Sequence, residues 1–153
     1  MGLLSKSSKI STNSALQDEI RNILKFEGCY IDGEILYIQS NRPVVVNARM
    51  IRSIFCENGV LSGRIKEIHI NTQVYMHIVQ DHRFDPNIHI KVDESVCISG
   101  YGDGRNKIEN INMACKSFWG DGVVDILSSK IECVCAHIPR GCIVDKTEIK
   151  YVI

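Results

Sequence analysis

The sequence has no excess of charge of either sign and no long hydrophobic run. Its 153 residues include 18 basic and 18 acidic side chains, so no overall field attracts nucleic acid or an anionic membrane. No run approaches the roughly 18 consecutive apolar residues of a transmembrane helix, and the first residues lack the apolar stretch of a secretory signal. These absences predict a cytoplasmic protein with no nucleic-acid partner and no transmembrane segment.

Proline is scarce, and the cysteines lack the pattern of a disulfide framework. The three prolines, Pro43, Pro86 and Pro139, each stand at the edge of an apolar stretch, where a missing N–H breaks no strand pairing. The seven cysteines are odd in number and irregularly spaced, and the cytosol keeps thiols reduced. We therefore expect reduced cysteines, most of them acting as small core hydrophobes.

The amino-acid composition, with 44% hydrophobic and 24% charged residues, is typical of one globular domain. Residues 1–13 are rich in Ser and Lys and poor in apolar groups, which predicts a flexible tail. Ser14 with Gln17 forms a possible capping box and Gly28 a stop, which predicts a short amphipathic helix over residues 14–27. Its apolar face consists of Leu16, Ile20, Ile23 and Leu24.

Residues 28–153 show short stretches of alternating apolar and polar residues, which predicts a single all-β domain. Asx-Gly pairs, which accept the positive φ angles of tight turns, fall within or between these stretches. They are Asp32-Gly33, Asn58-Gly59, Asp103-Gly104 and Asp121-Gly122.

Two architectures accommodate this many short strands: an antiparallel β-sandwich or barrel, and a β-solenoid of stacked coils. Many stretches carry only three or four inward groups, as in Ile88, Ile90 and Val92, about what one side of a coil needs. This count favours the solenoid, with the antiparallel sandwich or barrel as the alternative.

Short segments of this chain resemble two protein families. The segments "FEGCYIDGEI" and "CENGVLSGRIKEIHINTQVY" resemble bactofilins, which are polymer-forming β-solenoids, although the glycine rhythm is lost after Met76. The segments "IKEIHINTQVYMHIVQD", "NIHIKVDESV" and "GDGVVDILSSKIECVCA" resemble head GIN domains, which are adhesin-like β-solenoids. Both resemblances imply a right-handed β-solenoid without a known catalytic centre.

The stretch "IKEIHINTQVYMHIVQ" predicts a contact face. Apolar residues hold the even positions, and His69, Tyr75 and His77 share the odd, solvated side. Metal binding by these imidazoles requires the chain to turn between them, because a straight strand holds them far apart. Trp119 is a second binding candidate, although a core plug is the more economical interpretation of a single tryptophan.

The segment "CVCAH" is a weak candidate for metal binding. Cys133, Cys135 and His137 alternate onto one side of a predicted strand and could offer ligands to zinc. The segment has no second C-x2-C knuckle, and inward thiols in a narrow core explain the same pattern. We therefore predict no bound metal, no cofactor and no catalytic residue.

The predicted function is self-assembly without enzymatic activity. Solenoid ends expose unpaired backbone groups that must be capped or paired with another subunit, which predicts oligomers or filaments of this chain. The alternative is a module that binds another protein or a small ligand, and a metal- or thiol-dependent enzyme ranks last. The predicted oligomer interface comprises Leu16, Ile20, Ile23, Leu24, Ile149, Tyr151 and Ile153.

Overall fold

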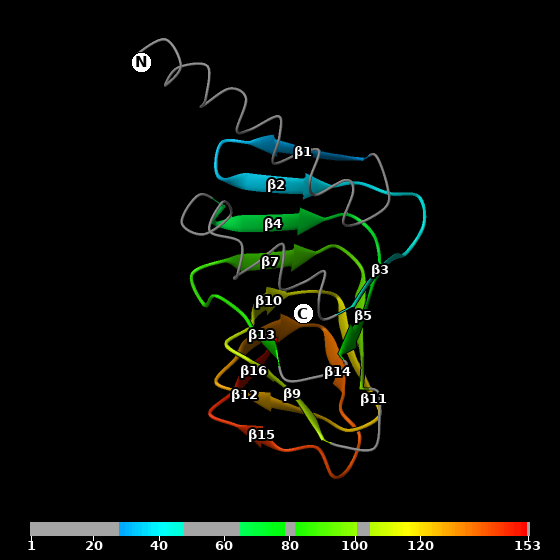
Figure 1. The fold of residues 1–153 in the computed structure, drawn as a ribbon, viewed down its shortest axis with the longest axis vertical. Helices are drawn as coiled ribbons and strands as arrows, with labels where there is room; N and C mark the ends of the chain where they lie inside the picture. Colours follow the sequence, from blue (N-terminus) through cyan, green and yellow to red (C-terminus); the bar gives the residue numbers. More distant parts are fainter. Residues whose placement is uncertain (1–27, 48–64, 79–81, 101–104, 153) are drawn as a thin grey trace.

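The computed structural model describes residues 28–47, 65–78, 82–100 and 105–152. Within these ranges the chain is all-β and winds into a β-solenoid of about four turns (Figure 1). The predicted tail and helix at residues 1–27 lie outside the described residues. So do five of the seven predicted interface residues, namely Leu16, Ile20, Ile23, Leu24 and Ile153.

Three sheets form the sides of the solenoid, and each full coil adds one strand to each sheet. Sheet A contains, in order, β1 (Cys29–Asp32), β2 (Ile35–Ile38), β4 (Glu67–Ile70), β7 (His89–Val92), β10 (Asn112–Ala114), β13 (Lys130–Cys133) and β16 (Glu148–Tyr151). Sheet B contains β3 (Val44–Asn47), β5 (Val74–Ile78), β8 (Ser95–Gly100), β11 (Ser117–Asp121) and β14 (Cys135–His137). Sheet C contains β6 (His82–Arg83), β9 (Asn106–Glu109), β12 (Val124–Leu127) and β15 (Val144–Asp145).

The strand directions exclude the antiparallel sandwich or barrel that the sequence left open. Every pairing between successive coils of the described part is parallel, as between β4 and β7 or β11 and β14. The exception is β1, which pairs with β2 as an antiparallel hairpin. Its turn is the predicted Asp32-Gly33 pair, where Gly33 has a φ of 61°. The prediction of an all-β solenoid is therefore confirmed, and the alternative is wrong.

The core consists of side chains stacked in columns along the solenoid axis. In sheet A, Leu36 pairs with Ile68, Ile68 with Ile90, Ile90 with Met113 and Met113 with Ile131, and each is at most 1% exposed. Burial of one such aliphatic side chain contributes about 2 kcal/mol. The alternation of these residues with polar ones therefore fixes which face of each strand points inward.

The corners between sheet C and sheet A repeat one backbone conformation. Asn110, Ser128 and Lys146 have positive φ angles of 62°, 51° and 51°, and they directly follow β9, β12 and β15 at equal intervals along the chain. The last coils thus share one length, and each turns at this corner through a left-handed residue. Asparagine adopts this conformation readily, but serine and lysine do so rarely, so at Ser128 and Lys146 the corner conformation is set by the coil rather than by residue preference.

Candidate functional site

The outward face of sheet B carries a continuous column of apolar and aromatic side chains. Val45, Tyr75, Cys97, Trp119 and His137 stand in register on five adjacent strands. Val45 is 50% exposed, Tyr75 37% and Trp119 47%, so the column faces solvent. Adjacent strands lie about 4.8 Å apart, which places these side chains in van der Waals range of their neighbours.

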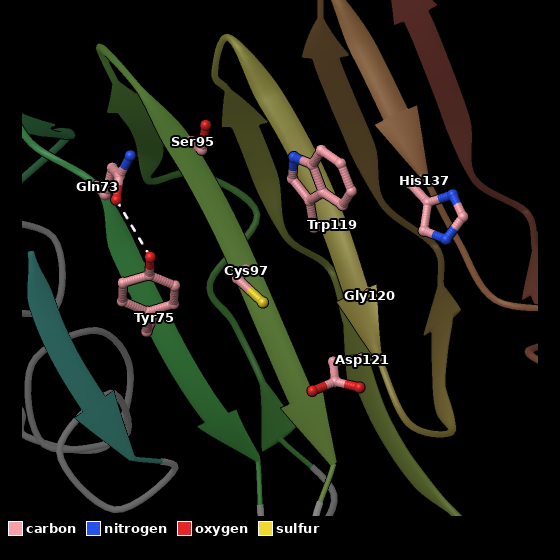
Figure 2. Close-up of a pocket in the computed structure, with 8 residues that line it drawn as sticks. All are labelled: Gln73, Tyr75, Ser95, Cys97, Trp119, Gly120, Asp121 and His137. Atoms are coloured by element: carbon pink, nitrogen blue, oxygen red, sulfur yellow. Dashed lines mark hydrogen bonds between the residues drawn. The ribbon is translucent and has the colours of Figure 1, made fainter.

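A shallow groove of about 560 Å³ follows this column, and we call it the sheet B groove. Figure 2 shows Tyr75 and Trp119 on either side of Cys97, with Asp121 below them and His137 beyond Trp119. The groove is lined by Gln73, Tyr75, Ser95, Cys97, Trp119, Gly120, Asp121 and His137.

Short contacts orient the two aromatic rings of the groove. The Tyr75 hydroxyl donates a hydrogen bond of 3.2 Å to Oε1 of Gln73, which leaves the Gln73 amide nitrogen free to donate (Figure 2). The rings of Trp119 and His137 lie 5.5 Å apart at an angle of 45°. Within the described part of the chain, the side chains of Ser95 and Asp121 have no protein partner. They therefore offer one hydroxyl and one carboxylate to a ligand.

The prediction that His69, Tyr75 and His77 share one face is wrong. The chain turns a corner at residues 71–73, so His69 lies on β4 in sheet A while Tyr75 and His77 lie on β5 in sheet B. His69 instead forms a 2.9 Å contact from Nε2 to Oδ1 of Asp93, and its ring lies 5.6 Å from that of Tyr37. Of the three predicted residues, Tyr75 alone lines the groove.

The sequence favoured the interpretation that Trp119 fills the end of the core, and this interpretation is wrong. Its side chain is 47% exposed, whereas the preceding Phe118 is 1% exposed and fills the core. Adjacent residues of a strand point to opposite faces of the sheet, so on β11 an inward Phe118 places Trp119 outward. Trp119 and Tyr75 thus enter the same groove from β11 and β5.

The predicted alternation of Cys133, Cys135 and His137 onto one side of a single strand is also wrong. Val134 forms a corner between β13 and β14, so Cys133 is buried while Cys135 and His137 are exposed. No group of three or more His, Cys, Asp or Glu side chains in the described ranges is placed to hold a metal ion.

Burial sets the chemistry of the inward thiols. It raises the pKa of Cys115 to about 12, and the neighbouring Cys133 and Cys135 thiols act in the same direction. Burial also raises the pKa of Cys133, with a smaller effect from Cys135. Both inward thiols are therefore protonated at neutral pH and serve as packing groups rather than as nucleophiles.

The second candidate feature is the C-terminal end of the solenoid, where core columns end uncovered. In sheet C, Ile108 is 0% exposed and Ile126 3%, but Val144, next in register, is 42% exposed. In sheet A, Cys133 is 0% exposed, and its partner Tyr151 is 60% exposed. Ile149 and Ala136 are likewise less buried than Ile131 and Phe118 above them. We call Ala136, Val144, Ile149 and Tyr151 the open end.

An ion pair beside the open end fixes the last coil. Arg105 donates to both carboxylate oxygens of Asp125, at 3.0 Å and 2.6 Å, and to the carbonyl oxygen of Gly141 at 2.7 Å. Oδ1 of Asp125 also accepts the Ile143 N–H at 2.7 Å. The Arg105 hydrogen bond holds the pKa of Asp125 below its ordinary value, with the Ile143 N–H acting in the same direction against the effect of burial. The pairing of Arg105 with Asp125, 20 residues further along the chain, depends on how successive coils stack.

Comparison with known proteins gives no family for the chain. No protein-family model, no curated protein and no solved structure matches the chain. Within the described ranges, no helix has the length and apolar character needed to cross a membrane. The fold and the two sites define a β-solenoid with an uncovered C-terminal end and an aromatic groove on one sheet. The likeness to bactofilins and head GIN domains stays a prediction.

Proposed function

We propose that this protein is a non-enzymatic assembly protein whose copies join through the open end. The observation that carries the proposal is the exposure of inward side chains in the last coil, above all Val144 and Tyr151. Their equivalents one coil earlier, Ile126 and Cys133, are at most 3% exposed. Exposed apolar surface of this kind marks an interaction site, and a second copy would cover it with the same chemistry.

The two ends of the solenoid differ, which favours contact between like ends. At the first coil, Leu36, Val44 and Val46 are at most 5% exposed, so these inward side chains of sheets A and B are already covered. At the last coil, β14, β15 and β16 are the final strands of their sheets in the described part of the chain. Joining two open ends buries both and forms a two-fold dimer, while a filament needs a further contact elsewhere.

The finer expectations from the sequence belong to the same proposal. We propose a right-handed coil and a cytoplasmic location, on the support of the resemblance to bactofilin-like solenoids and of the sequence composition. The assembly needs no cofactor, and its partner is another copy of this chain.

Substitution of the open end tests the proposal. The double variant Val144→Glu with Tyr151→Glu places two carboxylates on the uncovered columns, and we expect it to be monomeric where the unchanged protein is dimeric or larger. Light scattering coupled to size exclusion measures the mass. The matched control, Val45→Glu with Tyr30→Glu, changes the same residue types at 50% and 41% exposed positions on β3 and β1, at the other end of the solenoid. A monomeric unchanged protein at all concentrations, or equal masses for the two variants, contradicts the proposal.

A second function is favoured by the sheet B groove: binding of a ligand or another protein at the exposed Tyr75 and Trp119. Exposed aromatic side chains beside unpaired polar groups are the composition of binding sites rather than of an inert surface. This function is compatible with assembly, because most of the groove lies on β5, β8 and β11, away from the open end. Protection of Trp119 from collisional quenching by acrylamide in the presence of a ligand would test it.

A further inference from the structure

The charges around the sheet B groove restrict its ligand. Among the lining residues that the structure describes, none is a Lys or Arg, and Asp121 supplies a carboxylate. An anionic ligand such as a phosphate, a nucleic acid or an acidic sugar would find no fixed positive charge and one repelling group. With His137 as the one imidazole among the described lining residues, these charges favour a neutral ligand over an anion.

The polar groups of the groove point to a ligand rich in hydroxyl groups. Asp121 accepts hydrogen bonds, the Gln73 amide nitrogen donates them, and the Ser95 hydroxyl does both. They flank the exposed faces of Tyr75 and Trp119 (Figure 2). A flat aromatic surface beside donors and acceptors matches a sugar ring, which has C–H groups on its face and hydroxyls around its edge.

The floor of the groove argues against an extended peptide. Its central strand, β8, is paired with β5 on one side and β11 on the other, so its backbone groups are already used. Strand addition requires a free sheet edge, which the groove floor does not provide. The ligand must therefore be held by side chains alone.

The spacing of the two rings sets the length of the ligand. Tyr75 and Trp119 stand on β5 and β11 with β8 between them, which separates their backbones by two strand spacings, about 10 Å. One sugar ring cannot cover both aromatic rings, so a ligand that contacts both has at least two.

We propose that the sheet B groove binds a neutral oligosaccharide of two or more sugar rings. One ring stacks on Tyr75 and another on Trp119, while Gln73, Ser95 and Asp121 form hydrogen bonds to the hydroxyls. The proposal rests on the binding function suggested above for this groove, and it is independent of assembly through the open end.

The single tryptophan of the chain is Trp119, so intrinsic fluorescence reports on the groove without a label. The probes are soluble tetrasaccharides of glucose, N-acetylglucosamine, mannose and galactose, their monosaccharides, a sulfated tetrasaccharide and a pool of neutral pentapeptides. We expect a saturable change in emission with at least one neutral tetrasaccharide, and binding at least about tenfold weaker for its monosaccharide and for the sulfated form.

Two variants and a matched control test the assignment of residues by calorimetry. Tyr75→Ala and Trp119→Ala should each weaken binding of that tetrasaccharide by about tenfold or more. Tyr30→Ala should leave it unchanged, because Tyr30 is a 41% exposed tyrosine that also contacts a glutamine, Gln39, but lies in sheet A. Equal affinity in all three variants overturns the proposal.

The probe set separates failure of this inference from failure of the binding function itself. Binding of the pentapeptides but of no sugar overturns the oligosaccharide and keeps the groove as a binding face. Tighter binding of the sulfated tetrasaccharide than of the neutral ones would likewise overturn the neutral oligosaccharide and keep the groove as a binding face. No response of Trp119 to any probe overturns the oligosaccharide proposal, and absence of acrylamide protection by a cell extract as well would remove the binding function.

Discussion

Asp125 shows how one buried carboxylate holds the last coil of the solenoid. It accepts two hydrogen bonds from Arg105 and one from the Ile143 N–H, and its side chain is 11% exposed. Loss of this acceptor leaves the turn at residues 141–143 without its anchor to β12. The stabilisation of the last coil by these hydrogen bonds therefore depends on the ionised state of Asp125.

The depressed pKa of Asp125 predicts an acid-dependent loss of stability. Because the folded pKa lies below the unfolded value of about 3.9, the stabilisation is complete above that value and is lost as pH falls through the folded pKa. We expect Asp125→Asn to be less stable than the unchanged protein at neutral pH and to lose less stability between about pH 5 and about pH 2. Thermal unfolding over this pH series measures both effects, and parallel curves for the two proteins would refute the role of Asp125.

The thiols predict a clear order of chemical reactivity. Cys135 is exposed, whereas Cys115 is 8% exposed and Cys133 is 0% exposed, with raised pKa values. Since the thiolate is the reactive species, iodoacetamide at about pH 8 should modify Cys135 in the native protein and spare Cys115 and Cys133 until denaturant is added. Mass spectrometry of peptides locates the label. Native labelling of Cys115 as fast as that of Cys135 would contradict the placement of these residues.

At the scale of elements, the repeated corner after β9, β12 and β15 stores backbone strain. Lys146 has a φ of 51°, and Lys146→Gly should raise the free energy of unfolding by about 0.5–1 kcal/mol, because the left-handed cost of about 1–2 kcal/mol exceeds the extra chain entropy of glycine. The control Lys130→Gly, in β13, should lower it by about 0.5–1 kcal/mol. Urea denaturation measures both changes. Destabilisation of equal size in the two variants would show that the corner carries no strain.

The sequence predicted strands but not where they break, and the corners explain why. Between Ile70 and Val74 the corner keeps inward residues on even positions, as if one strand continued. Alternation therefore could not separate His69 from Tyr75. Between Cys133 and Ala136 the corner is shorter by a single position and shifts the phase, so Cys133 points inward and Cys135 outward.

The groove could not be predicted because it depends on register between coils. Tyr75, Cys97 and Trp119 recur at equal intervals along the chain, but the step from Trp119 to His137 is shorter. Unequal coil lengths hide the column from any fixed period. Trp119 was found as a candidate through its residue type, while Gln73, Ser95 and Asp121 have residue types common on any polar surface.

In the described part of the chain, the fold is a stack whose inner side chains in sheets A and B are covered at the first coil, whereas the inner columns are exposed at the last coil. Each coil covers the apolar side chains of the coil before it, and under the proposed assembly a second copy would do the same for the last described coil. The uncovered columns involve all three sheets, through Ala136, Val144, Ile149 and Tyr151. This geometry, rather than a reactive centre, is the basis of the proposed function.

Hydrogen exchange of the edge strands at low and high protein concentration tests this account most directly. Backbone N–H groups of β14 and β16 lie on the final strands of their sheets in the described chain, and pairing or burial by a second copy should protect them. We expect slower exchange of β14 and β16 at high concentration, with β4 and β7 unchanged because they are interior strands. Exchange of β14 and β16 that is the same at every concentration would contradict assembly through the open end.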